Sequence, residues 1–112
     1  MIGIALAFVV AAAAGTLARA TVGRWLNQDF PWGTFAVNVS GSFALGLLAH
    51  ASTSVATVVG TGLLGAYTTF SSFARDAVAL WEQRDRVPAV MYVVATVIAC
   101  VGAAWAGIAI VV

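Results

Sequence analysis

Charged side chains are the scarcest feature of this sequence. Only 8% of its 112 residues are charged and 62% are hydrophobic, whereas roughly a quarter of the residues in ordinary globular domains are charged. A soluble fold of this length could not bury so much apolar surface. The composition therefore predicts a single domain whose solvent is the lipid bilayer.

Residue types that other functions require are also rare. The chain has no lysine, its five basic residues are all arginine and its net charge is +1, so no nucleic-acid partner is expected. The single cysteine, Cys100, excludes an internal disulfide. The single histidine, His50, ends an apolar run, where an interfacial residue is more typical than a metal ligand. No catalytic constellation is visible, and the sequence predicts that the protein is not an enzyme.

The hydrophobic residues fall into four long runs. The second run holds 19 uncharged residues, and a helix of that length spans about 28 Å, close to the hydrocarbon thickness of a bilayer. The first run ends in small residues like a signal-peptide cleavage site, but no basic residue precedes it and three further runs follow. We therefore predict an all-α integral membrane protein with four transmembrane helices in one domain, at residues 1–18, 32–50, 54–81 and 87–112.

The arginines are distributed unevenly among the connections. Arg19 and Arg24 fall in or beside the first connection, and Arg75, Arg84 and Arg86 fall at the end of the third run or in the third connection. The second connection and both termini carry no charged side chain. By the positive-inside rule, the first and third connections are predicted to be cytoplasmic and both termini to face outwards, in a multi-pass protein of the cell membrane.

Small and polar residues recur every four positions in the second run, at Thr34, Asn38, Ser42 and Gly46. This spacing places them on one helix face. Serine and glycine are typical of a packing seam between membrane helices. Asn38 fits a packing seam less well, because a carboxamide in hydrocarbon must find partners or face water. Both a packing role and a functional role remain open for it.

The fourth run has a similar stripe, formed by Tyr92, Thr96 and Cys100. Threonine can bond the backbone of its own helix, and a tyrosine near a helix start can be interfacial. Because the three polar groups lie on one face, together they indicate a functional role more strongly than any one of them does alone.

The third run contains the segment GAYTTFSSF, residues 65–73, which gathers four serine and threonine hydroxyl groups around aromatic rings. Gly60, Gly62 and Gly65 precede the β-branched pair Thr68 and Thr69, and both features weaken a helix. We predict a break in the third helix there, because freed carbonyls are tolerated in a membrane only where they line a cavity or bind an ion. If the helix resumes at Phe70, then Phe70 and Phe73 share one face.

A small four-helix multidrug or cation exporter of the proton-coupled type is the alternative function. Exporters of that kind resemble one another in carrying a glutamate inside the first span. Here the first run has no ionisable side chain before Arg19, which disfavours this alternative.

Two motifs together resemble one known family. GRWLNQDFPWGTFAVNVSGSFALGLL, followed by GLLGAYTTFSSF, resembles the Fluc (CrcB) fluoride channels, and the resemblance covers the whole chain. It implies an antiparallel dimer of four-helix subunits with two narrow pores. It also implies a fluoride-selective ion channel that passively exports cytoplasmic fluoride and so lowers its intracellular concentration.

The resemblance also implies roles for individual residues. Backbone carbonyls of Gly65 and Thr68 match positions that hold a structural Na⁺ at the dimer interface, and Arg19 matches a boundary arginine. Cys100 stands where the family usually offers a hydroxyl, and a thiol is a weaker donor. The residues that match the fluoride pore are Asn38, Phe70, Phe73, Thr69, Ser71, Ser72, Tyr92 and Thr96.

The uneven distribution of arginine indicates which kind of subunit pairs with this chain in the dimer. A subunit that inserts in both orientations needs little arginine asymmetry, whereas this chain has five arginines on one side and none on the other. The partner is therefore either a second copy or an oppositely oriented homologous subunit, and the charge distribution favours the homologue.

Overall fold

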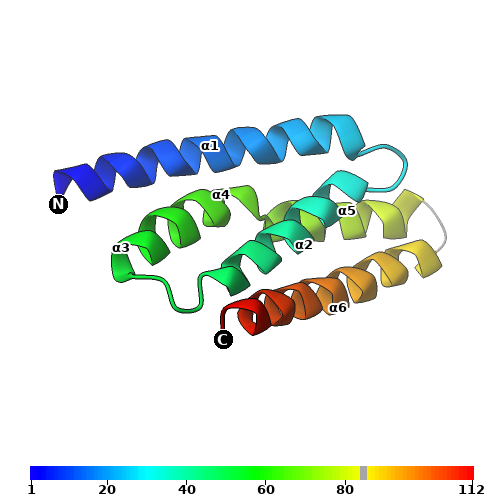
Figure 1. The fold of residues 1–112 in the computed structure, drawn as a ribbon. Coiled ribbons are helices and arrows are strands. Elements are labelled where there is room, and N and C mark those ends of the chain that lie inside the picture. Colours follow the sequence, from blue (N-terminus) through cyan, green and yellow to red (C-terminus); the bar gives the residue numbers. More distant parts are fainter. Residues whose placement is uncertain (84–85) are drawn as a thin grey trace.

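The computed structural model describes residues 1–83 and 86–112, and its described elements are helices joined by short connections (Figure 1). Arg84 and Asp85, which contribute to the predicted charge of the third connection, lie outside the described residues. The prediction of an all-α protein is confirmed for the described part of the chain.

The first helix, α1 (Ile2–Leu26), continues past the apolar run and carries Arg19 and Arg24 on its last turns. No proline occurs before Asn27, where the backbone becomes extended (φ −73°, ψ 123°). The side-chain oxygen of Asn27 then accepts hydrogen bonds from the backbone N–H groups of Gly33 (2.8 Å) and Thr34 (3.1 Å). These N–H groups belong to the first turn of the next helix, α2 (Trp32–Leu47), and have no partner within it. Asn27 therefore ends one helix and caps the next.

The predicted third span consists of four successive helical segments. They are α3 (Thr53–Val55), the π-helix η1 (Ala56–Leu64), α4 (Gly65–Tyr67) and α5 (Phe70–Gln83). Between α4 and α5, the backbone at Thr68 is extended (φ −78°, ψ 155°). The chain therefore leaves the helical conformation at Thr68 and Thr69 and resumes it at Phe70.

The last helix, α6 (Arg86–Val111), packs along α2, while α1 packs along η1 and α4. Glycines allow the close approach of α2 and α6, since a Cβ on Gly46 would collide with the carbonyl oxygen of Ala104 and one on Gly107 with that of Phe43. In Figure 1, α1 and α6 form the two outer sides, with α2, α4 and α5 between them. The α1–α2 connection lies at the same end as the end of α5 and the start of α6.

Two helices of the described chain, α1 and α6, are long and apolar enough to cross a membrane, judged by length and composition. Their outward side chains are largely exposed hydrophobic residues, such as Leu6 and Val10 on α1 and Ile98 and Trp105 on α6. An exposed apolar surface of this kind is typical of contact with lipid or with another protein.

Candidate functional site

The backbone that leaves the helix at Thr69 is bound by the side chain of Asn38 on α2. The Nδ2 of Asn38 donates to the carbonyl oxygen of Thr69 (3.0 Å), and the N–H of Thr69 donates to Oδ1 of Asn38 (2.8 Å). The carboxamide thus pairs with one peptide group as another peptide would. Asn38 is only 9% exposed, and it keeps one amide hydrogen that this pairing does not use.

The side chain of Thr69 caps the start of the next helix, α5. Its Oγ1 accepts a hydrogen bond from the backbone N–H of Ser72 (3.0 Å) and lies 3.3 Å from the hydroxyl of Ser71. An acceptor in front of the first turn satisfies an N–H that has no helical partner. Thr69 therefore acts as the N-cap of α5, a role that was not predicted, although threonine directly before a helix start is a typical N-cap.

A cavity of about 270 Å³ brings together most of the predicted pore residues. Asn38 contributes from α2, Thr69 from the extended connection, Phe70 and Phe73 from α5, and Thr96 from α6. The other lining residues are Ser42, Leu45, Thr68, Val97 and Cys100. Part of each predicted polar stripe therefore lines one shared cavity: Asn38 and Ser42 from the second span, and Thr96 and Cys100 from the fourth.

Thr96 has a distinctive environment in this cavity. The residue is 4% exposed, and its Oγ1 has no hydrogen-bond partner among residues 1–83 and 86–112. A buried hydroxyl without a partner costs free energy, because it has lost its water. Thr96 thus places an unpaired, buried hydroxyl in the wall of the cavity.

The aromatic residues of the predicted site form a connected group. The ring centroids of Phe70 and Phe73 lie 5.9 Å apart, and those of Phe73 and Tyr92 lie 5.3 Å apart. Tyr92 is fully buried and also meets Phe30 edge to face at 5.4 Å. Phe70 is different, because 80% of its surface is exposed. Tyr92 thus packs against Phe73, which lines the cavity, but does not line the cavity itself.

Gly65 and Thr68, the predicted sodium positions, lie directly before the extended connection. In a continuous helix the N–H of Thr69 would bond to the carbonyl of Gly65, but that N–H donates to Asn38. The N–H and the hydroxyl of Thr68 both turn back to the carbonyl of Leu64, each at 2.9 Å. The donor that would have bonded to the Gly65 carbonyl is therefore used elsewhere.

A second cavity, of about 260 Å³, is polar and lies at the arginine-rich end of the molecule. It is lined by Arg19, Arg24 and Arg75 together with a single acidic residue, Asp76. Ser72 and Thr69 also line it, and Thr69 lines the first cavity as well. The Nε atom of Arg19 is buried and has no hydrogen-bond partner in the described part of the chain.

Sequence reasoning missed the contacts that hold this polar end together. The hydroxyl of Thr34 donates to Oδ2 of Asp76 (2.8 Å) and lies 3.3 Å from Nδ2 of Asn27. The hydroxyl of Tyr92 is not one of these contacts, because it is buried and has no hydrogen-bond partner among residues 1–83 and 86–112. Little in the sequence indicated the contacts of Asn27, because it lies four residues before Pro31 and not directly before the helix start, where a cap is expected.

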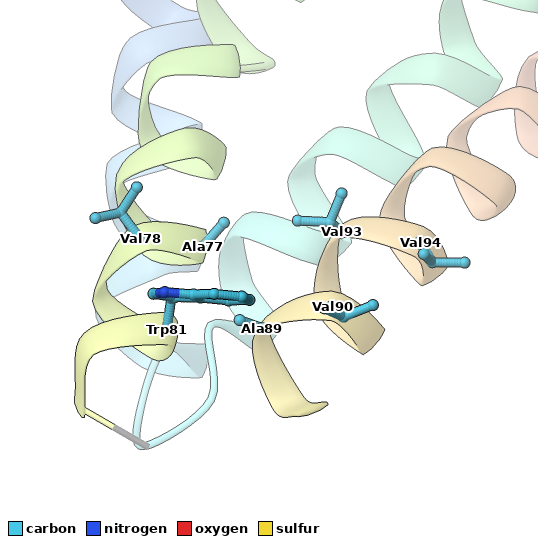
Figure 2. A pocket seen from close by; sticks show the side chains of 7 residues that line it. All are labelled: Ala77, Val78, Trp81, Ala89, Val90, Val93 and Val94. Atoms are coloured by element: carbon cyan, nitrogen blue, oxygen red, sulfur yellow. The ribbon is translucent and has the colours of Figure 1, made fainter. Parts of the chain in front are cut away.

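A third hollow lies between α5 and α6 and is apolar. Figure 2 shows the ring of Trp81 on α5 facing the side chains of Ala89, Val90 and Val93 on α6. Ala77, Val78 and Val94 complete the lining. This groove offers no fixed donor to an anion and cannot replace the hydration shell of an ion.

Known proteins resemble the chain over nearly its whole length. Residues 6–108 match the family described as "CrcB-like protein, Camphor Resistance (CrcB)". The chain belongs to this family. The family predicted from the GTFAVN and TTFSSF motifs is therefore confirmed.

Several members of the CrcB-like family carry a functional name. The chain is 40% identical to the "Fluoride-specific ion channel FluC" of Agrobacterium fabrum, over 98% of this chain and 96% of that protein. It is 40% identical to the protein of the same name in Rhizobium leguminosarum bv. trifolii, over 95% and 94%. It is 46% identical to the "Fluoride-specific ion channel FluC 2" of Rhodococcus jostii, over 85% and 87%.

Proposed function

We propose that this chain is a membrane-embedded subunit of a fluoride-selective channel and that it has no catalytic role. The observation that carries this proposal is the cavity between α2, α5 and α6, where neutral hydrogen-bond donors converge without a buried cation. The family names agree with this assignment. None of the observations favours the exporter alternative.

The donors of the cavity suit a small, strongly hydrated anion. Thr96 offers a hydroxyl without a partner, and Asn38 keeps one free amide hydrogen. The positive ring edges of Phe70 and Phe73 can face an anion. Neutral donors bind more weakly than a buried arginine, and conduction requires an ion that can leave again. Chloride is larger and a poorer acceptor, so the same donors select against it.

Two cavities suggest a route for the ion. The arginine-lined cavity raises the local concentration of anions at one end of the molecule, by the focusing effect of like charges around a cleft. Thr69 lines both cavities, and Ser72 and the neighbouring Ser71 add hydroxyls at the same place. We assign Ser71, Ser72 and Thr69 to the passage between the cavities, with Arg19 at its boundary.

The functional assembly is proposed to be an antiparallel dimer of four-span subunits with two pores. Phe70 exposes 80% of its surface beside an open cavity, and a second subunit would cover both. The partner is a second copy or an oppositely oriented homologue. The "FluC 2" name of the Rhodococcus relative is compatible with two such chains in one organism. With arginines gathered at one end, the first and third connections are proposed to be cytoplasmic.

A sodium ion at the dimer interface fits the residues present. Sodium takes oxygen ligands, and the carbonyl of Gly65 has lost the N–H that a continuous helix would give it. The negative C-terminal end of α4 also favours a cation at Gly65 and Thr68. Purifying the protein with N-methylglucamine in place of sodium should reduce the thermal stability of the dimer. Equal stability in the two salts would remove sodium from the structure.

The proposed function is tested by ion efflux from liposomes that contain only this chain. We expect release of fluoride and retention of chloride, measured with ion-selective electrodes. Equal efflux of the two anions would contradict selectivity. If the lone chain releases neither anion, but releases fluoride when a homologous subunit is added, an obligate heterodimer is supported.

A further inference from the structure

The proposed ion pathway does not use the apolar groove between α5 and α6. This groove measures about 320 Å³, and all seven of its lining side chains are hydrophobic (Figure 2). Ala77 and Ala89 are too small to fill the space between the two helices, and the ring of Trp81 forms one wall. The groove is open to the surroundings, because Trp81 and Val90 expose 44% and 52% of their surface. Its shape and composition suit a hydrocarbon chain.

A positive charge lies at one wall of this groove. The guanidinium carbon of Arg86 lies 4.6 Å from the ring centroid of Trp81, which is a cation–π contact. Arg86 is also the first residue of α6, so the positive end of the helix dipole lies at the same place. Glu82, the residue after Trp81, is exposed and is not among the lining residues. An apolar groove thus adjoins a cationic side chain.

The position of the groove fits the boundary of a bilayer. The end of α5 and the start of α6 lie at the same end of the molecule as the α1–α2 connection (Figure 1), and α1 carries Arg24 in its last turn. Tryptophan is enriched at membrane–water boundaries. Arginine keeps its stem on apolar surface there and extends its charge towards the headgroups. A phospholipid at this place would present its acyl chains to Trp81 and its phosphate to Arg86.

We propose that this groove binds an acyl chain of an anionic phospholipid and that the lipid phosphate pairs with Arg86. Basic pockets between membrane helices are typical sites for acidic headgroups. An antiparallel second copy is a poorer occupant, because it would bring its opposite end to Arg86, and the second connection and both termini carry no acidic side chain. The binding of a lipid here does not depend on which ion the protein conducts.

The experiment uses the full chain in liposomes, with Trp81 as its only tryptophan after Trp25→Phe, Trp32→Phe and Trp105→Phe. Bromine quenches tryptophan fluorescence at contact range, so lipids brominated on their acyl chains report occupancy of the groove. Brominated phosphatidylglycerol and brominated phosphatidylcholine are titrated separately into unbrominated phosphatidylcholine. We expect Trp81 to bind phosphatidylglycerol about fivefold more tightly, the factor expected for one arginine beside anionic lipid. Equal quenching by the two lipids would overturn the proposal.

A pair of arginine variants separates the groove from the general charge of this end. Arg86→Gln should abolish the preference for phosphatidylglycerol, because it removes the charge beside Trp81. Arg24→Gln is the matched control, since it removes the same charge from the same end of the molecule but from α1. The preference should remain about fivefold in this control. An equal loss in both variants would indicate general attraction to the membrane surface and would overturn the proposal.

A second pair of variants tests the shape of the groove. Val90→Phe places a larger side chain in the lining, so quenching of Trp81 by both brominated lipids should fall. Val101→Phe is the matched control, because Val101 is exposed, lies outside the groove and follows Val90 on the same face of α6 about three turns later. Quenching should be unchanged in this control. Equal quenching in the two variants would contradict an acyl chain in the groove.

Native mass spectrometry of the unaltered chain repeats the comparison without the tryptophan substitutions. Bound phosphatidylglycerol should be retained in preference to phosphatidylcholine, and Arg86→Gln should remove that preference. Equal retention of the two lipids would overturn the proposal. Absence of quenching by either brominated lipid would also overturn it, because protein, such as a second subunit, would then cover Trp81. None of these measurements uses fluoride flux, so a failure here is distinct from a failure of the proposed function.

Discussion

The pairing between Asn38 and the backbone of Thr69 can be tested by Asn38→Leu. Leucine has a similar volume but cannot accept from the Thr69 N–H or donate to its carbonyl, which now lie 2.8 Å and 3.0 Å from the carboxamide. Each buried backbone group left unpaired costs about 1–3 kcal/mol. The variant should therefore lose about 2–6 kcal/mol of unfolding free energy, in addition to its fluoride flux.

Unfolding can be followed by the fluorescence of the four tryptophans in mixed micelles of increasing denaturing detergent. Ser42→Ala is the matched control, since it removes a hydroxyl from the same helix and cavity without touching Thr69. Asn38→Ala should be less destabilising than Asn38→Leu, because the smaller side chain leaves space for a bridging water. Equal stability of Asn38→Leu and Ser42→Ala would refute the structural role of the carboxamide.

Three further substitutions test other parts of the structure. Phe70→Leu should slow fluoride efflux about two- to tenfold through loss of the ring edge, and a wild-type rate would remove Phe70 from the pore. Unfolding of the dissociated subunit should not change, because 80% of Phe70 is exposed in the single chain. Thr69→Ala should cost about 1 kcal/mol by removing the N-cap of α5, and Thr69→Ser should restore it; equal loss in both variants would argue against the cap. Gly46→Ala should cost about 1–3 kcal/mol, because the new Cβ meets the carbonyl of Ala104 on α6. Gly102→Ala, which meets nothing within 4 Å, should be neutral, and equal effects of the two glycine variants would contradict the close packing of α2 and α6.

The four-residue spacing of polar side chains grouped part of the predicted site, whereas the pore roles of its residues came from the resemblance to the CrcB family. On a helix, residues four apart share a face, so Asn38 and Ser42 on one helix and Thr96 and Cys100 on another could be grouped from the sequence. Their meeting in one cavity required the packing of α2 against α6, which is a tertiary property. Tyr92 belongs to the same stripe, yet it packs between Phe30 and Phe73 behind the cavity, and spacing alone cannot separate these two outcomes.

Other features could not be read from the sequence. The glycines of the third run indicated a weak helix, but they did not distinguish a loosened α-helix from the π-helix η1 at Ala56–Leu64. The end of the first apolar run at Ala18 did not mark the end of α1, which continues to Leu26. A helix can extend beyond the apolar region because arginine and threonine are also tolerated in helices.

Asn38 illustrates a limit of residue-by-residue reasoning. Its position in an apolar helix predicted that the carboxamide needs a partner, but an ion, water and another helix were all possible partners. In the structure one amide hydrogen and the carbonyl oxygen bind Thr69, thirty-one positions along the chain. The side chain thus supports the backbone and keeps only one donor for the cavity.

The most direct test of the fluoride pathway is the rate of fluoride efflux in Thr96→Val. This substitution conserves side-chain shape and removes only a buried hydroxyl that has no protein partner in the described chain. If that hydroxyl serves an ion in transit, fluoride efflux should fall about tenfold, as expected for one lost hydrogen bond of about 1.4 kcal/mol. Thermal stability should be unchanged or higher, and Thr96→Ser should conduct like the wild type. Wild-type fluoride efflux in Thr96→Val would contradict the assignment of this cavity as the ion pathway.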